Sequence, residues 1–152
     1  MKIQRPKFSF RDKLKPLQCV TKIIIHHTAE DGWDVYKTHE FHQKVRGWSG
    51  IGYNYFIEEE GTVFEGRGLY VGAHAKGYNS ETIGICMTGN FDKYDPTIAQ
   101  IDSLHSLCRD LMEQFSICEA HILGHRELEG VTKTCPGIRF SMVELRKTLS
   151  QK

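Results

Sequence analysis

Two histidines and one cysteine have the residue types of a catalytic zinc site. His26 lies near the end of an apolar segment, and His125 and Cys135 lie ten residues apart in a polar stretch near the C-terminus. Two imidazoles and one thiolate leave one position of a tetrahedral zinc open, as catalytic sites require. This spacing is a weak pattern by itself, and a lone histidine is more often structural than a ligand. The metal hypothesis therefore rests on the combination of all three residues.

Both ligand-bearing segments are expected at strand ends. Residues 22–28 contain three consecutive isoleucines, which predicts a strand buried on both faces. His26 lies at its C-terminal end, where α/β sheets place ligands. Neighbouring strand residues point to opposite faces, so only one of His26 and His27 can reach a given site. A short strand over residues 120–123 is expected to deliver the turn that contains His125.

The rest of the chain alternates strand-like and helix-like segments, which predicts a single α/β domain with about four or five strands and three helices. Along the strand at residues 51–57, Tyr53, Tyr55 and Ile57 are expected to share one face. The other expected elements are helices at 34–45, at 98–115 (behind a Thr97–Gln100 capping box) and after Ser141, strands at 62–65 and 82–88, and a glycine-rich loop at 66–80.

Composition limits the function classes. The chain has 152 residues, 39% of them hydrophobic, which is enough for one domain over residues 1–152 to fold unaided. Its net charge of +1 gives no nucleic-acid footprint. No apolar run approaches the roughly 20 residues of a membrane span, and the N-terminus lacks the apolar core of a secretory signal. We therefore expect synthesis in the cytoplasm, with any export by another route.

Residues 1–22 form a basic leader with seven basic side chains and one acidic side chain. Two interpretations remain open. The leader packs on the domain through Phe8, Phe10, Leu14 and Leu17, or it is an arm attracted to an anionic cell envelope.

The five cysteines argue against a disulfide framework, because their number is odd and no export signal is seen. Cys19, Cys86, Cys108 and Cys118 lie in apolar or strand-like contexts and are expected to be small buried residues. Cys135 differs because its neighbours are polar or turn-forming.

Five short motifs follow one another along the chain: HHTA at 26–29, GW with IGYN at 47–54, GAHAKGYN at 72–79, GHRE at 124–127 and TCPG at 134–137. In this order they resemble the type-2 N-acetylmuramoyl-L-alanine amidases, which include phage endolysins and are similar to the peptidoglycan recognition proteins of animals. The resemblance covers about residues 20–148. It implies a mixed β-sheet with helices on both faces.

The resemblance also implies one Zn²⁺ per chain, held by His26, His125 and Cys135. It places Tyr53 and Lys133 at two auxiliary catalytic positions. The tyrosine positions water or donates to an oxyanion, and the lysine brings positive charge to the developing negative charge. Without the resemblance, they are a half-buried strand tyrosine and a surface lysine. Many recognition proteins have a hydroxyl residue at the position of the lysine, so phage-type endolysins are the closer relatives.

Contacts to a muramyl peptide are implied for His42, Arg46, His74 and Asn79. Arg46 is suited to a carboxylate of the peptide stem, whereas His42 is equally consistent with a residue at the edge of the core. Glu127, next to a ligand, is expected to accept from a ligand imidazole or to form a surface salt bridge.

The implied activity is zinc-dependent hydrolysis of the amide between the lactyl group of N-acetylmuramic acid and L-alanine of peptidoglycan. One alternative is a non-catalytic peptidoglycan-binding module, although such proteins lack the ligand cysteine. Another is a cysteine peptidase using Cys135 and His125, which is disfavoured because no helix begins at the thiol. The motifs leave no room for a separate cell-wall-binding domain, so targeting is expected from the groove or from the basic leader. The lack of a signal peptide fits a phage or prophage lysin released through a membrane lesion. A wall-recycling enzyme fits equally.

Overall fold

The computed structural model describes residues 1–151, which form one six-stranded sheet in the order β1-β4-β3-β5-β2-β6. All neighbouring strands pair in parallel except β3 and β4, so the sheet is mixed, as predicted. The strands are β1 (Ile3–Gln4), β2 (Lys22–His27), β3 (Tyr55–Ile57), β4 (Val63–Glu65), β5 (Thr82–Met87) and β6 (Ile122–Gly124). The helices are α1 (Val35–Glu40), α2 (Ile98–Phe115) and α3 (Met142–Ser150), with short helical turns η1 (Phe41–Val45), η2 (Asn79–Glu81), η3 (Glu119–His121) and η4 (His125–Glu127).

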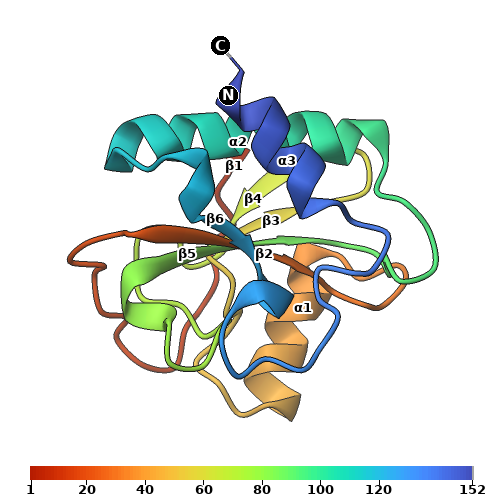
Figure 1. Ribbon diagram of the computed structural model, residues 1–152. Helices are drawn as coiled ribbons and strands as arrows, with labels where there is room; N and C mark the ends of the chain where they lie inside the picture. Colours follow the sequence, from red (N-terminus) through yellow and green to blue (C-terminus); the bar gives the residue numbers. More distant parts are fainter. Residues whose placement is uncertain (152) are drawn as a thin grey trace.

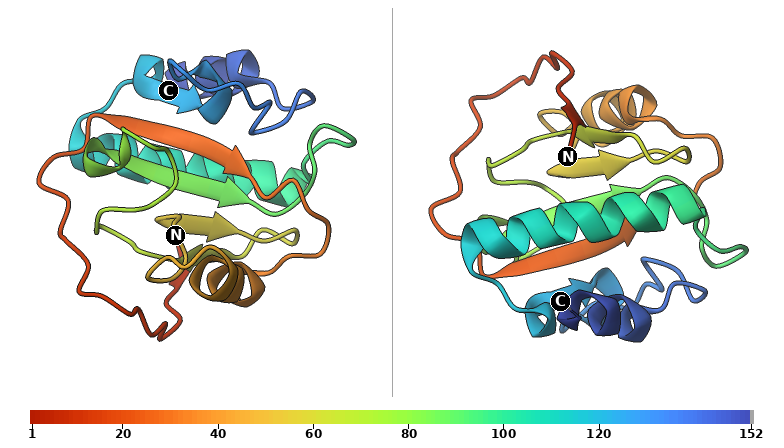
Figure 2. Two further views of the ribbon diagram at one scale, coloured as in Figure 1. Left: turned by 90° about the horizontal axis from the view of Figure 1, so that it is seen from below. Right: turned by 90° about the horizontal axis from the view of Figure 1, so that it is seen from above.

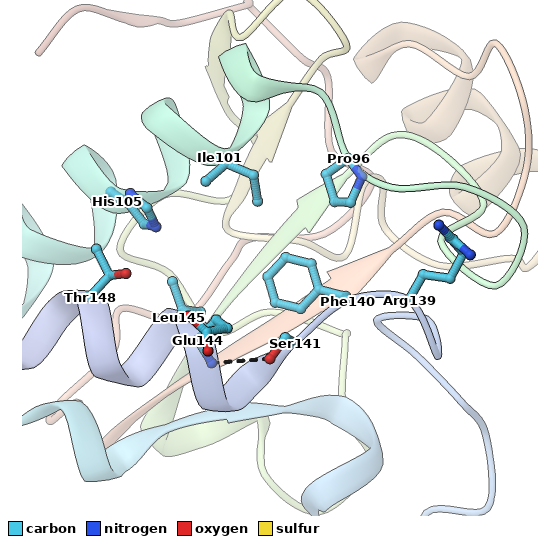
Figure 3. Close-up of a pocket in the computed structure, with 9 residues that line it drawn as sticks. All are labelled: Pro96, Ile101, His105, Arg139, Phe140, Ser141, Glu144, Leu145 and Thr148. Atoms are coloured by element: carbon cyan, nitrogen blue, oxygen red, sulfur yellow. Dashed lines mark hydrogen bonds between the residues drawn. The ribbon is translucent and has the colours of Figure 1, made fainter.

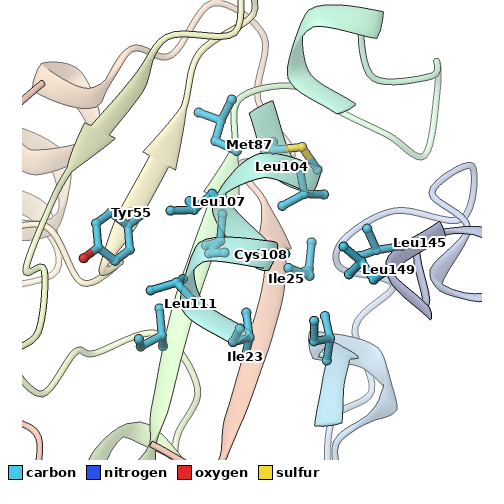
Figure 4. Close-up of a cluster of buried hydrophobic side chains, with 14 of the residues drawn as sticks. Ile23, Ile25, Tyr55, Met87, Leu104, Leu107, Cys108, Leu111, Leu145 and Leu149 are labelled. Atoms are coloured by element: carbon cyan, nitrogen blue, oxygen red, sulfur yellow. The ribbon is translucent and has the colours of Figure 1, made fainter. Parts of the chain in front are cut away.

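The helices divide between the two faces of the sheet, with α2 and α3 on one face and α1 on the other (Figures 1 and 2). The larger core lies under α2 and α3, where Ile23 and Ile25 pack with Leu104 and Leu107 (Figure 4). All four side chains are 0–1% exposed. This buried apolar layer anchors the central strands of the sheet.

The opposite face of the same strands carries the polar side chains. Because strand side chains alternate, Ile24 and His26 of β2 point away from α2. Cys86 of β5 likewise packs with Val35 and Phe56 on the α1 side. Candidate functional residues therefore gather under α1 and its neighbouring loops.

Two helix starts agree with the sequence patterns. Asp34 caps α1 by accepting from the backbone of Lys37, and the predicted helix at 34–45 corresponds to α1 followed by η1. Thr97 and Gln100 form the predicted capping box of α2.

The predicted strand at 51–57 is wrong for its first four residues, because only 55–57 join the sheet. The backbone of residues 52–54 hydrogen-bonds instead to the loop at 66–73 and to Gly84 of β5. The carbonyl of Gly52, for example, accepts from the backbone N–H of Ala73. The chain therefore changes direction before β3. Tyr55 and Ile57 face α2, whereas Tyr53 packs on the α1 side, which corrects the expectation that all three share one face.

Three smaller expectations also change. The strand expected at 120–123 is β6 at Ile122–Gly124, because the preceding residues form the turn η3. A sixth strand, β1, lies in the leader. Cys19 and Cys118 are exposed rather than buried, whereas Cys86 and Cys108 are buried as expected.

The leader packs on the domain. Phe8 stacks on the ring of His39 with their centroids 4.3 Å apart, and Phe10 meets the same ring edge-on. Arg5 pairs with Glu65 at 2.9 Å beside the parallel contact between β1 and β4.

A hollow of about 190 Å³ lies between α2 and α3, lined by residues such as Ile101, His105 and Phe140 (Figure 3). It lies on the face of the sheet opposite to the polar side chains. Within residues 1–151, no helix has the length and apolar character needed to cross a bilayer.

Candidate metal centre

The three candidate ligands meet at one end of the sheet. His26 lies in β2, His125 begins η4 directly after β6, and Cys135 lies in the loop before α3. Because β2 and β6 are parallel neighbours with Ile25 opposite Gly124, their carboxyl ends lie side by side. The nitrogen and sulfur atoms that each residue offers lie within 4.8 Å of one another.

The spacing fits a zinc ion. Nδ1 of His26 lies 3.7 Å from Sγ of Cys135. A tetrahedral zinc with bonds of about 2.0 Å to nitrogen and about 2.3 Å to sulfur holds these atoms about 3.5 Å apart. Nε2 of His26 points elsewhere, so Nδ1 is the nitrogen that faces the metal position.

Burial favours the metal-binding protonation state of the two histidines but opposes that of the cysteine. Desolvation, followed by the neighbouring imidazoles of His74 and His125, lowers the pKa of His26 well below its usual value. Desolvation also lowers the pKa of His125. Both imidazoles are therefore neutral near pH 7. Burial raises the pKa of Cys135 to about 12. A divalent cation would reverse that tendency, since a coordinating thiol is deprotonated.

Arg126 fixes the loop that carries the cysteine. Its backbone N–H donates to the carbonyl of Cys135 at 2.7 Å. Its guanidinium donates to the carbonyls of Thr134, Gly137 and Phe140. Its signals in the sequence were its place in the GHRE motif and its position next to a candidate ligand, and neither indicates which carbonyls it binds.

Asp92 holds the same loop from the other side. Its carboxylate accepts from the hydroxyl of Thr134 and the backbone N–H of Ile138, both at 2.9 Å. These hydrogen bonds lower the pKa of Asp92, the Ile138 bond contributing most. The loop is thus clamped between a cation and an anion.

Tyr53 borders the candidate ligands. Its ring centroid lies 5.2 Å from that of His26 and 5.4 Å from that of His42. Burial, then the thiols of Cys86 and Cys135, raises the pKa of Tyr53 well above its usual value. The phenol therefore stays protonated and remains a hydrogen-bond donor. The exposed Lys133 is close enough for its charge to contribute to the lowered pKa of His125.

Asn54 positions Tyr53 and was also missed. It is fully buried, its amide donates to the carbonyls of Gly68 and Tyr70, and its oxygen accepts from Gly84 of β5. Its signals in the sequence were its place in the IGYN motif and an amide within an otherwise apolar segment. Arg67, 8% exposed, supports the same loop through backbone carbonyls.

Three expected substrate contacts are engaged within the protein. Nδ1 of His42 accepts from Gly52, and burial lowers the pKa of His42 to about 4. Both ring nitrogens of His74 have side-chain partners. Oδ1 of Asn79 accepts from the backbone N–H groups of His74 and Ala75.

The guanidinium of Arg46 lies over the rings of Phe41 and Trp48, 5.4 and 5.9 Å from their centroids. This stacking limits the orientations of the guanidinium, so its N–H groups point in a preferred direction.

The carboxylate of Glu127 accepts from the backbone N–H of Gly124 and forms a bidentate pair with the guanidinium of Arg146 at 2.8 and 2.9 Å. These contacts support the salt-bridge interpretation of Glu127.

A groove of about 970 Å³ joins these side chains. Its size is suited to a ligand as large as a sugar–peptide. All nine residues selected from the sequence line it: His26, His42, Arg46, Tyr53, His74, Asn79, His125, Lys133 and Cys135.

The chain is similar to amidases, endolysins and peptidoglycan-recognition proteins. Residues 16–138 match the family described as N-acetylmuramoyl-L-alanine amidase. A peptidoglycan-recognition protein of Drosophila melanogaster is 39% identical over 124 residues, which span 75% of this chain and 66% of the fly protein. The endolysin of Enterobacteria phage T3 is 38% identical over 72% of this chain and 79% of its own length. A solved amidase endolysin from Clostridium intestinale is 34% identical with a TM-score of 0.91, covering 99% of this chain and 97% of that one.

We predict that acid destabilises the metal-free protein. Burial lowers the pKa of His42 to about 4 and of His74 to about 3, so the unfolded chain binds protons near pH 6.5 that the folded chain excludes. Stability is therefore complete above about pH 6.5 and falls as the pH drops toward these folded values, by up to about 1.4 kcal/mol per pH unit for each histidine.

Urea unfolding in chelator at pH 7.5, 6.0 and 5.0 measures this slope. His42→Gln should make the slope shallower by about one proton, because it removes one of the excluded sites. Stability that is equal at all three pH values would contradict the neutral, buried state of these imidazoles.

Proposed function

Because the chain belongs to the N-acetylmuramoyl-L-alanine amidase family, we propose that it is a zinc-dependent peptidoglycan amidase. It hydrolyses the amide bond between the lactyl group of N-acetylmuramic acid and L-alanine of the stem peptide. One zinc ion is held by His26, His125 and Cys135. The observation that carries the proposal is the convergence of two nitrogens and a sulfur within 4.8 Å in a groove of ligand size.

Bound zinc supplies Lewis acidity, which lowers the pKa of water from 15.7 to about 7 and polarises a carbonyl. The chain contributes two neutral imidazoles and one thiolate, so the occupied site carries a formal charge of +1. A carboxylate ligand in place of either histidine would cancel that charge. The chosen donor set therefore preserves the positive charge that amide activation needs.

Tyr53 and Lys133 act on the negative charge that develops on the amide oxygen. Tyr53 is partly buried, and its raised pKa keeps the phenol protonated and available to donate a hydrogen bond to that oxygen. Lys133 adds a positive charge at the rim of the same groove. A donor aimed at such a charge is typically worth about 3–4 kcal/mol.

The groove orients the muramyl peptide. Arg46 binds a stem carboxylate through its guanidinium, which the rings of Phe41 and Trp48 hold in place. The amide oxygen of Asn79 is occupied by backbone donors, so its Nδ2 serves the ligand. His42 and His74 form the wall against which the sugar lies.

The protein acts on the peptidoglycan layer, as expected of a relative of phage endolysins. A lysin that reaches the layer through a membrane lesion and an enzyme that recycles wall fragments would use the same groove. The non-catalytic alternative is disfavoured because both Cys135 and Tyr53 lie at the groove.

Removal of the metal tests this function. Elemental analysis of the purified protein should give one zinc per chain, a chelator should abolish activity, and added Zn²⁺ should restore it. Mass spectrometry of digested sacculi should show free L-alanine amino termini and intact glycan strands. Cys135→Ser should lose both zinc and activity. Sacculi that are bound but left uncut by the zinc-loaded protein would instead identify a binding module.

Tyr53→Phe separates the phenol from the metal. We expect kcat to fall about 10²- to 10³-fold, because one donor to the developing oxyanion is lost, while the zinc content remains at one per chain. Tyr55→Phe is the matched control, since that tyrosine faces α2 in the core. An unchanged rate for Tyr53→Phe would remove this residue from the chemistry.

A further inference from the structure

We propose that Thr82 is a positioning residue for the metal site, because it acts through His74 to keep Nδ1 of His26 free of a proton. This inference rests on the proposed function, in which Nδ1 of His26 binds zinc. Thr82 begins β5, and its hydroxyl makes no hydrogen bond to any of the three ligands.

A chain of hydrogen bonds runs from the backbone to the ligand. The hydroxyl of Thr82 lies 2.8 Å from the carbonyl oxygen of Tyr78. The same hydroxyl oxygen lies 3.1 Å from Nε2 of His74. Nδ1 of His74 in turn lies 2.9 Å from Nε2 of His26. Thr82, His74 and His26 are 2%, 8% and 2% exposed, so bulk water does not replace these partners.

The carbonyl at one end determines the direction of every bond. We assign the single hydroxyl proton of Thr82 to the carbonyl oxygen of Tyr78, which can only accept and is the nearer of the two neighbours, at 2.8 Å against 3.1 Å for Nε2 of His74. The hydroxyl oxygen then accepts from Nε2–H of His74. A neutral His74 with its proton on Nε2 has a bare Nδ1, which accepts from Nε2–H of His26. Nδ1 of His26 is therefore bare and faces Cys135, from whose sulfur it lies 3.7 Å.

The sheet explains why these groups reach one another. In the parallel pairing of β2 with β5, His26 is opposite Cys86, Ile24 is opposite Gly84 and Lys22 is opposite Thr82. Alternate residues share a face, so Thr82 and Gly84 lie on the same side of the sheet as His26.

Gly84 makes room for the bridging ring. A Cβ at this position would lie 2.4 Å from Cγ and 2.5 Å from Nδ1 of His74. The imidazole of His74 thus occupies the space above a glycine and spans from one strand to the other. Asn79 fixes the backbone of His74 by accepting from it at 2.9 Å.

The consequence is that His26 already has its metal-binding tautomer in the metal-free protein. A neutral imidazole can carry its proton on either nitrogen, and the partner of the second nitrogen selects which one binds metal. Metal-binding histidines commonly donate to a carboxylate or a carbonyl. Here the partner is a neutral imidazole, so the tautomer is selected without adding a negative charge that would offset the zinc.

The test compares Thr82→Val, which keeps the shape and removes the hydroxyl, with Thr82→Ser, which keeps the hydroxyl. Competition with a chromophoric chelator measures zinc affinity, and ¹⁵N NMR of the metal-free protein reports which ring nitrogen of His26 carries the proton. Thr82→Val should weaken zinc binding about 10- to 100-fold and populate the Nδ1–H tautomer of His26. Thr82→Ser should retain the affinity and tautomer of the unmodified chain.

Equal zinc affinity and an unchanged His26 tautomer in Thr82→Val would overturn the inference. Should that variant fail to fold, the unmodified metal-free protein decides the question, because a proton on Nδ1 of its His26 contradicts the chain of bonds. The tautomer is measured without metal, so a chain that binds no zinc would end the proposed function while leaving this result readable.

Discussion

Parallel pairing of β2 between β5 and β6 is the constraint on which the candidate site depends. It brings the carboxyl ends of β2 and β6 together, so that His26 and His125 approach from neighbouring strands. Neither histidine needs a flexible loop to reach the other. Only Cys135 arrives on a loop, and that loop is clamped by Arg126 and Asp92. Two ligands are positioned by the sheet and the third by charge-assisted hydrogen bonds.

The two faces of the sheet have different roles: the α2 face forms the main apolar core, and the α1 face carries the polar groups of the candidate site. The α2 face is dry and apolar, and it fixes the positions of the central strands (Figure 4). The α1 face carries histidines, a threonine and an asparagine at low exposure. Such groups are costly to bury unless they are hydrogen-bonded. Within the part of the chain that the structure describes, no buried side-chain nitrogen or oxygen lacks a partner. The polar face is thus a closed network that orients the groove.

Local patterns in the sequence were sufficient for an α/β domain, the start of α1 and the capping box of α2. The mixed sheet and most of the residues that line the groove were implied by the family resemblance instead. Roles set by distant backbone could not be read in this way. Tyr53 faces the groove only because the chain bends before β3, and no pattern of alternation predicts that bend. Arg126 and Asn54 bind carbonyls of loops whose positions depend on the complete fold. For the same reason, His74 was expected only as a substrate contact, although its ring bridges two side chains.

The central claim is that two imidazoles and one thiolate hold a single zinc ion with one position left for solvent or substrate. X-ray absorption at the zinc edge of the metal-loaded protein tests it most directly. We expect one sulfur at about 2.3 Å and three lighter atoms, two of them imidazole nitrogens, at about 2.0–2.1 Å. A first shell without sulfur, or one closed by a second sulfur, would contradict the account.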